Sequence, residues 1–226
     1  MNKITTRYIA SLIDHTLLKP NATKNDITKL CEEAKEYGFA AVCVNPCYVS
    51  LAKKTLEKTH IKVATVIGFP LGANTKIAKL VEARDAIANG ADEIDMVINI
   101  SLLKSGDEIS VFDEIKIIRE ATLGKILKVI IETAYLTREE KIKICKIIKD
   151  AKADFVKTST GFAPQGATVE DIKLIKSVIG SRIGIKASGG IRDFKTAVEM
   201  IKAGATRIGT SSSIDIIKGK VTDSSY

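Results

Sequence analysis

Residues 183–212 read IGIKASGGIRDFKTAVEMIKAGATRIGTSS, and this stretch contains the unit that decides the fold. It opens with a short apolar run that ends in two glycines. Asp193 then stands where a residue would cap an amphipathic helix, and Gly204 stands where that helix would end. A second β-branched run follows at 206–212. A strand, a capped helix and another strand in succession predict a βαβ unit with parallel strands.

The same unit recurs along the whole chain. Eight such runs occupy 12–18, 40–46, 62–69, 93–100, 128–133, 154–160, 183–189 and 206–212. Helix signals separate them, among them Thr23 with a stop at Gly38, the capping box of Thr137 with Glu140, and Thr168. Eight strands that alternate with helices predict an α/β fold.

The count of eight runs favours a single (β/α)8 TIM-barrel domain over residues 1–226, with a short extra helix at 3–11 that covers the barrel's bottom. An open, doubly wound sheet is the alternative. Such a sheet often carries a glycine-rich phosphate loop after its first strand, and KPNATKND at 19–26 contains no glycine. The barrel is therefore the preferred fold class.

The composition is that of a globular protein with an anionic partner. Of 226 residues, 45% are hydrophobic and 27% charged, which excludes a disordered chain. The net charge is +8, which suits a phosphorylated metabolite, a nucleic acid or a membrane surface. The sequence has no Trp, 6 Phe and 5 Tyr, and so few aromatic residues disfavour recognition of nucleic acids by base stacking. We expect no nucleic-acid partner.

The chain contains no signal-peptide pattern and no long apolar run, so we expect a cytoplasmic protein with no membrane partner. Its four cysteines form no CxxC pair and are expected to be free thiols. With only two histidines, a His-rich metal site is excluded. A zinc site of His15, Cys43 and Cys47 is conceivable, but we expect neither a metal nor a cofactor.

Active sites of such barrels lie at the carboxyl ends of the strands. Alternation along the predicted strands turns Asp95, Lys157 and Lys186 toward the barrel interior. The simplest alternative is a structural ion pair between Asp95 and one lysine, and a shift of one residue would turn a lysine outward. Two inward lysines on neighbouring strands beside a carboxylate favour a functional role, because burial of an ammonium is costly.

The chemistry that uses two adjacent lysines is nucleophilic catalysis by an amine. A second ammonium and partial desolvation both lower the pKa of a lysine, so that the free amine can attack a carbonyl. The resulting iminium accepts electrons when a carbon–carbon bond breaks. The residues therefore predict a metal-free aldolase of class I.

The loops after the last strands have the composition of a phosphate site. In barrels, phosphate often binds in the loops after strands seven and eight. Here these loops are rich in glycine and serine, whose backbone N–H groups and hydroxyls bind anions. A single loop of this kind is usually only a turn. Two in the expected positions favour a phosphate pocket.

At this point the motifs show a resemblance. The chain resembles the deoxyribose-phosphate aldolase family in a series of motifs that occur in the same order. They are DHTLLKP (14–20), VIGFPLG (66–72), EIDMVIN (93–99), VKTSTGF (156–162), IKASGGI (185–191) and RIGTSS (207–212). The resemblance covers about residues 8–213. It implies a cofactor-free class I aldolase on a (β/α)8 barrel. Its reaction would be the reversible cleavage of 2-deoxy-D-ribose 5-phosphate, a small phosphorylated sugar, to D-glyceraldehyde 3-phosphate and acetaldehyde.

The resemblance also implies roles for individual residues. Lys157 would form the Schiff base, Lys186 would perturb it and assist proton transfer, and Asp95 would donate and accept protons. The implied inner polar and phosphate-binding positions are Asp14, Thr16, Cys43, Thr160, Gly161, Gly189, Gly190, Arg192, Gly209, Ser211 and Ser212. We interpret Cys43 as a packing residue, because no histidine is placed to activate it.

Three positions depart from the family or are variable in it. Phe162 stands where some members carry a lysine, and Ser213 where many carry glycine. Tyr226 is proposed to assist protonation of the enamine, with a frayed tail as the alternative.

We expect a homo-oligomer, a dimer or a tetramer. The rivals are another phosphate-binding barrel enzyme, such as an isomerase or a different Schiff-base aldolase, and a non-catalytic nucleic-acid-binding protein.

Overall fold

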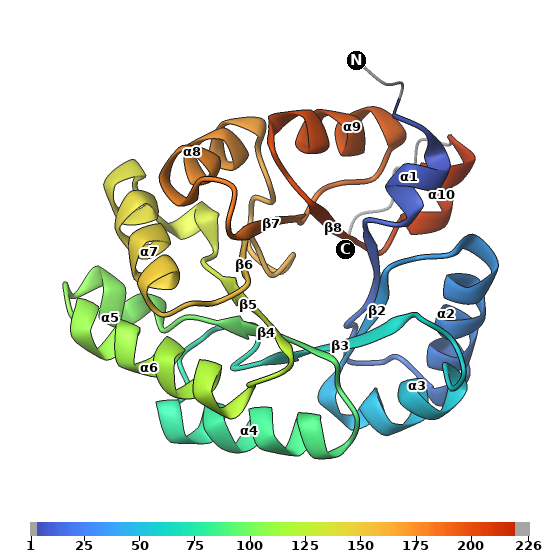
Figure 1. Cartoon of the computed structure of the whole chain (residues 1–226), viewed down its shortest axis with the longest axis horizontal. Coiled ribbons are helices and arrows are strands. Elements are labelled where there is room, and N and C mark those ends of the chain that lie inside the picture. Colours follow the sequence, from blue (N-terminus) through green and yellow to red (C-terminus); the bar gives the residue numbers. More distant parts are fainter. Residues whose placement is uncertain (1–3, 220–226) are drawn as a thin grey trace.

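The computed structural model describes residues 4–219 and forms a closed barrel of eight parallel strands (Figure 1). The strands are paired in sequence order, and β8 pairs with β1 to close the barrel. Their bounds are β1 Ile13–Leu17, β2 Ala41–Val44, β3 Lys62–Ile67, β4 Glu93–Val97, β5 Ile126–Ile130, β6 Phe155–Lys157, β7 Gly184–Ser188 and β8 Arg207–Thr210. All eight predicted runs are strands, so the predicted fold class is confirmed.

Helices surround the barrel in the connections between strands (Figure 1). They are α1 Thr6–Ala10, α2 Lys24–Tyr37, α3 Val49–Thr55, α4 Lys76–Ala88, α5 Ile100–Lys104, α6 Glu108–Ala121, α7 Arg138–Asp150, α8 Val169–Ile179, α9 Phe194–Ala203 and α10 Ser213–Lys218, with 3-10 turns η1 Pro46–Tyr48 and η2 Thr133–Tyr135. The short elements α5, η1 and η2 interrupt connections in which the sequence pattern indicated only one helix each.

The predicted helix ends are confirmed by hydrogen bonds. The Thr137 hydroxyl accepts from the amide of Glu140, whose carboxylate accepts from the amide of Thr137. At the starts of α8 and α9, the side chains of Thr168 and Asp193 accept from the amides of Asp171 and Thr196. Gly38 ends α2 with a φ of 68°, a left-handed conformation that glycine adopts without steric cost.

The predicted extra helix is present as α1, but its predicted place is wrong. It packs against α9 and α10 on the outer ring and does not lie across the opening of the barrel (Figure 1). The physical reason is its apolar side. Ile9 and Ala10 are buried in the main core, which lies between the strands and the helices, and their burial holds α1 beside the outer helices.

The barrel has two apolar regions with different surroundings. The main core lies between strands and helices, and Ile94, Met96 and Ile98 contribute to it as the alternation predicted. A small second cluster of Leu18, Cys43, Ala64 and Val66 lies inside the barrel. The interior also holds charged side chains, which come from β1 and from β4–β8. The site therefore lies in a half-apolar, half-ionic barrel.

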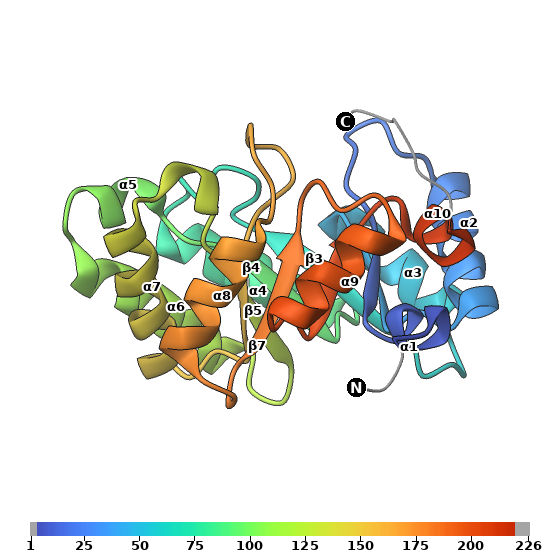
Figure 2. The same cartoon turned by 90° about the horizontal axis from the view of Figure 1, so that it is seen from above.

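The loops at the carboxyl ends of the strands are packed against one another. The amide of Ala167, in the loop between β6 and α8, donates to the carbonyls of Ser188 and Gly189 after β7, at 3.1 Å each. A Cβ on Gly166 would lie 2.2 Å from the carbonyl oxygen of Gly189, so only glycine permits this approach. These loops project from one end of the barrel (Figure 2). They bring the candidate phosphate residues together.

Candidate active site

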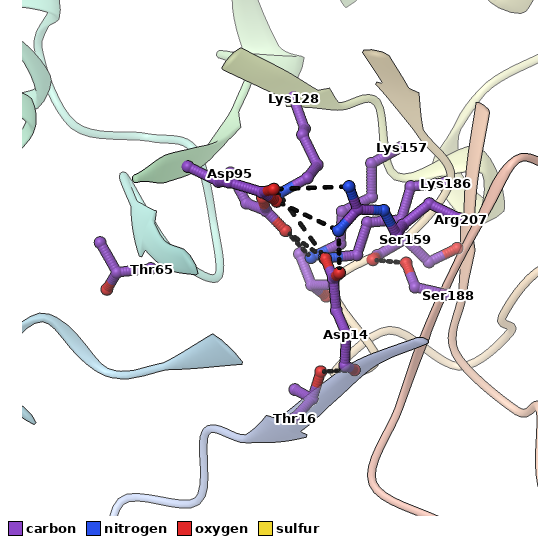
Figure 3. A network of polar contacts seen from close by, with 12 residues as sticks. Asp14, Thr16, Thr65, Asp95, Lys128, Lys157, Ser159, Lys186, Ser188 and Arg207 are labelled. Atoms are coloured by element: carbon purple, nitrogen blue, oxygen red, sulfur yellow. Dashed lines mark hydrogen bonds and ion pairs between the residues drawn. The ribbon is translucent and has the colours of Figure 1, made fainter. Parts of the chain in front are cut away.

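The centre of the barrel holds a buried ion cluster around Asp95 (Figure 3). Its Oδ1 accepts a hydrogen bond from the Nζ of Lys128 at 2.7 Å. Its Oδ2 accepts from Lys157 at 2.8 Å and from Lys186 at 2.7 Å. All four side chains are at least 97% shielded from solvent, with exposures of 3% or less. The two predicted lysines and the predicted aspartate therefore meet inside the barrel.

Asp14 on β1 forms the second centre of the cluster. Its Oδ2 contacts Lys186 at hydrogen-bond distance and lies 3.6 Å from the Nζ of Lys128. Its Oδ1 accepts from Arg207 at 2.6 Å. Lower in the barrel, Glu93 pairs with Lys128 at 2.6 Å and with Arg207 at 3.4 Å. Asp14 is thus an ionic partner of Lys186 and does not line the cavity described below.

Three members of this cluster were not predicted from the sequence: Glu93, Lys128 and Arg207. The predicted site residues lie late in their runs, whereas these three stand at the start or middle of their strands. The run at 128–133 was also placed too late, since β5 begins at Ile126. The strand register sets Lys128 level with Asp95. Charged residues at inward positions of short apolar runs were the signal that could have revealed them.

The charges of the cluster balance only when one lysine is neutral. Three carboxylates face three lysines and Arg207. Burial lowers the pKa of Lys157; Asp95 opposes this, and the adjacent Lys186 adds to it. Burial also acts on Lys186, but Asp14 and Asp95 outweigh it and raise its pKa. Lys157 is therefore the interior lysine that most readily gives a free amine.

The two carboxylates stay ionised. Burial alone would raise the pKa of Asp95, but Lys128, Lys157 and Lys186 hold it well below its usual range. The pKa of Asp14 is lowered in the same way by Lys186, Lys128 and Arg207 against the effect of burial. Asp95 is thus a carboxylate at neutral pH and is suited to accept a proton.

A cavity of about 290 Å³ opens at the carboxyl ends of the strands, above the cluster. Of the cluster residues, Lys157 lines it. The other lining residues are Thr16, Leu18, Thr160, Gly161, Ala163, Pro164, Gly166, Ser188, Gly189, Gly190, Ile191, Arg192, Gly209, Thr210, Ser211 and Ser212. Of the predicted inner polar and phosphate-binding positions, all but Asp14 and Cys43 are in this set. The amine of Lys157 and these loops therefore share one space.

Hydrogen bonds hold the loops that line the cavity. The hydroxyl of Ser188 donates to the carbonyl of Ser159 at 2.6 Å, and that of Thr210 donates to the carbonyl of Ile191 at 2.7 Å. Gly189 and Gly190 have φ values of 85° and 75°, so their backbone takes a path that other residues rarely adopt. Such loops present backbone amides to an anion.

Glu132 is a further residue near the cavity that was not predicted from the sequence. It follows β5 with a φ of 50° and is almost fully buried. Its carboxylate accepts from the amide of Thr160 at 3.2 Å and from the Thr160 hydroxyl. Burial raises its pKa, an effect that the bonds from Thr160 and the charge of Lys157 oppose. Glu132 thus fixes Thr160, the third residue after Lys157.

The remaining predicted residues have other surroundings. Cys43 lies in the inner apolar cluster, and burial raises the pKa of its thiol, in line with a packing residue. The conceivable zinc site is not formed, because His15 points outward to Glu33 and Ser213 while Cys43 points inward.

Phe162 is 46% exposed, and its ring meets that of Phe69 edge-on. Tyr226 lies outside the described residues.

No helix within residues 4–219 is long and apolar enough to span a membrane. Over the same residues, the side chains include no cluster of three or more histidines, cysteines or carboxylates arranged to hold a metal ion.

Fold and site together define a class of protein. The barrel combines a buried lysine of lowered pKa, a second lysine held as an ammonium, and a cavity lined largely by glycines and hydroxyl-bearing residues. An amine nucleophile beside a protonated neighbour and an ionised carboxylate is the arrangement of a Schiff-base-forming barrel enzyme.

Comparison with known proteins identifies the family within this class. A family model described as DeoC/LacD family aldolase matches residues 8–219, and the chain belongs to this family. It is 59% identical over 213 residues to a deoxyribose-phosphate aldolase from Caldanaerobacter subterraneus subsp. tengcongensis, covering 93% of this chain and 92% of that protein. A relative with the same name from Clostridium perfringens is 58% identical over 219 residues, covering 96% and 98%.

A solved structure shows the same fold. The tetrameric deoxyribose phosphate aldolase from Aeropyrum pernix superposes with a TM-score of 0.88 at 36% sequence identity, covering 95% of this chain and 91% of that chain.

Proposed function

We propose that this chain is a lyase that reversibly cleaves 2-deoxy-D-ribose 5-phosphate to D-glyceraldehyde 3-phosphate and acetaldehyde. The reaction proceeds through a Schiff base on Lys157. One observation carries the proposal: Lys157 is the interior lysine whose pKa is lowered, and it is the cluster residue that lines the cavity. The high identity to relatives named deoxyribose-phosphate aldolase supports the choice of substrate.

The first half of the reaction forms the iminium. The neutral amine of Lys157 attacks C1 of the open-chain aldehyde and gives a carbinolamine. Lys186, held as an ammonium between Asp14 and Asp95, donates a proton to the departing hydroxyl. Loss of that hydroxyl as water leaves a cationic iminium on Lys157, which the adjacent carboxylate of Asp95 stabilises.

The second half breaks the carbon–carbon bond. Asp95, acting through a water molecule, accepts the proton of the C3 hydroxyl. The C2–C3 bond breaks, its electron pair moves into the iminium to form an enamine, and glyceraldehyde 3-phosphate leaves. Protonation of the enamine at C2 and hydrolysis of the iminium release acetaldehyde and restore the amine of Lys157.

The phosphate group of the substrate belongs at the other end of the cavity. Gly189, Gly190 and Ser211 line the cavity together with the guanidinium-bearing Arg192, and we place the phosphate beside them. Backbone amides and hydroxyls there bind the phosphate, and no metal or cofactor takes part in the proposed reaction. The net charge of +8 favours an anionic substrate.

Reductive trapping tests this proposal. Incubation with acetaldehyde followed by borohydride should leave a two-carbon adduct, which peptide mass mapping should locate on Lys157. K157A should lose the adduct, and K54A, which alters an exposed lysine of α3, should retain it. An adduct on another lysine, or none at all, would contradict the proposed nucleophile. Release of glyceraldehyde 3-phosphate from the phosphorylated sugar then tests the substrate.

We further propose that the chain acts in the cytoplasm as a homo-oligomer, a dimer or a tetramer, without nucleic acid. The tetrameric relative from Aeropyrum pernix supports the formation of a homo-oligomer. Two apolar side chains one turn apart on α4 also support it, since Ile77 and Val81 are both more than half exposed. Light scattering would give the molecular mass in solution.

A further inference from the structure

Three hydrogen-bonded side chains, those of Ser213, His15 and Glu33, lie behind the cavity. The proposed mechanism does not use them. His15 is on β1 between Asp14 and Thr16, but its side chain points to the outside of the barrel. Its Nδ1 is 2.9 Å from the Oγ of Ser213, and its Nε2 is 2.9 Å from an oxygen of Glu33 on α2. His15 is 3% exposed and Ser213 is fully buried.

The hydrogen bonds determine which atom donates. Burial lowers the pKa of His15, against the effect of Glu33, so the ring is neutral at neutral pH. The carboxylate of Glu33 can only accept, which assigns the single N–H of His15 to Nε2. Nδ1 is then an acceptor, and the hydroxyl of Ser213 donates to it. The alternative acceptor for that hydroxyl, the carbonyl of Thr210, is farther away at 3.2 Å.

Ser213 ends the loop that carries the candidate phosphate ligands Ser211 and Ser212. On its other side this loop is fixed to the preceding one. The amide of Ser212 donates to the hydroxyl of Thr210 at 2.9 Å, and that hydroxyl donates to the carbonyl of Ile191. The hydrogen bond between Ser213 and His15 attaches the loop to β1. The loop is thus held from both sides.

We propose that His15 and Ser213 are positioning residues for phosphate recognition, which hold the 210–213 loop against β1 at the height where Ser211 and Ser212 meet the substrate. This inference rests on the function proposed above. It gives a role to the serine at 213, which the sequence marked as a departure from the family. The hydroxyl acts from behind the loop and does not contact the phosphate.

The chain of Ser213, His15 and Glu33 has the composition of a hydrolytic triad, but it cannot act as one. A nucleophilic hydroxyl must reach its substrate, and Ser213 has no exposed surface. The cavity lining includes Ser211 and Ser212 and ends before Ser213. The role of this chain is therefore to position the loop.

Two substitutions of His15 separate the two hydrogen bonds. In H15N the side-chain amide is placed near the Nδ1 position and retains a partner for Ser213. In H15Q the amide reaches the Nε2 position and retains the bond to Glu33 only. S213A removes the hydroxyl itself. For the phosphorylated sugar we expect H15Q and S213A to raise KM about three- to tenfold with little change in kcat, the effect of one hydrogen bond.

H15N should restore KM close to the value of the unaltered chain. Cleavage of unphosphorylated 2-deoxy-D-ribose should be nearly the same in all variants, because it does not use the phosphate loop. Equal losses on both sugars, or equal KM values for H15N and H15Q, would overturn the positioning role.

Calorimetric binding of inorganic phosphate gives a second measurement that is independent of turnover. Its affinity should fall in H15Q and S213A and recover in H15N, whereas unchanged affinity in both variants would contradict the inference. Failure of the proposed function would look different: the unaltered chain would then give no adduct with acetaldehyde and no cleavage of the phosphorylated sugar.

Discussion

At the scale of single residues, the two neighbouring lysines differ through their carboxylate partners. Lys157 and Lys186 are side by side in the strand register and are both buried. Lys186 contacts Asp14 and Asp95, whereas Lys157 has a hydrogen bond to Asp95 only. An ammonium in a low dielectric is stable where more negative charge faces it. The difference in pKa supports the roles proposed above, in which Lys186 is the acid and Lys157 the nucleophile, although their residue types are identical.

Substitution of Lys186 tests this division at the residue scale. In K186L, Asp95 loses a competing cation and pairs more closely with Lys157, so the pKa of Lys157 rises. Because only the free amine attacks, the rise of adduct formation with pH should move to higher pH. We expect kcat to fall at least about a hundredfold, the usual contribution of a general acid. The measurement is the pH dependence of the borohydride-trapped adduct.

Lys79 offers a matched control, since it is fully buried and paired with Glu114 outside the barrel interior. K79M should lower the stability of the fold and leave the pH dependence of the adduct in place. Near-normal turnover in K186L with an unshifted pH dependence would show that Lys186 does not set the state of Lys157.

At the scale of elements, the site depends on how closely the loops after β6 and β7 approach each other. Gly166 and Gly189 pack backbone to backbone, and the amide of Ala167 joins the two loops. Thr160, which Glu132 fixes, lies in the loop after β6, and Gly190 lies in the loop after β7. Strands position Lys157 and Lys186, but these loop contacts set the distance from the amine to the phosphate end.

G166A tests the loop contact. Its added methyl would meet the carbonyl of Gly189 at 2.2 Å, so one loop must move away from the other. Overpacking of this kind costs about 1–3 kcal/mol, and we expect KM for the phosphorylated sugar to rise about tenfold or more. Steady-state kinetics measures this, with Q165A at the exposed neighbouring residue as control. A KM in G166A that matched Q165A would contradict the role of the contact.

At the scale of the whole molecule, the ion cluster joins strands from all around the closed barrel. Asp14 comes from β1, Asp95 from β4, Lys128 from β5 and Lys186 from β7. Each carboxylate has lost its hydration and gains its stability from these partners only when the barrel is closed. We therefore expect the chain to unfold as one domain, in a single cooperative transition.

The pH dependence of unfolding tests this coupling. The pKa values of Asp14 and Asp95 are lowered in the folded protein, so the folded state binds fewer protons than the unfolded state near pH 4. Their contribution to stability is complete above about pH 5 and is lost as the pH falls below about 4, the unfolded pKa. Circular dichroism and tyrosine fluorescence should report one coincident thermal transition that falls steeply in this range.

D14N should be less stable at pH 7, because it leaves Lys186 and Arg207 without this carboxylate, and its stability should depend less on acid pH. Two separate transitions, or a midpoint that does not change between pH 5 and 3, would contradict the coupling of the cluster to the closed barrel.

Much of this protein was determined by the sequence itself. Local signals, such as the capping box at Thr137 and the glycine at 38, define where helices begin and end, because capping involves only residues a few positions apart. The repeated pattern of runs predicted eight strands and the barrel. Alternation within a strand turned Lys157, Lys186 and Asp95 inward, since successive side chains of a strand point to opposite faces.

Only the tertiary structure decided how those side chains are paired. The stagger between neighbouring strands sets Lys128 level with Asp95 and brings Arg207 of β8 to Asp14 of β1, residues that are distant in the sequence. Whether a buried lysine is an amine or an ammonium depends on the number of carboxylates within a few ångströms. Electrostatic energy depends on distances in space, and these exist only once the barrel has closed.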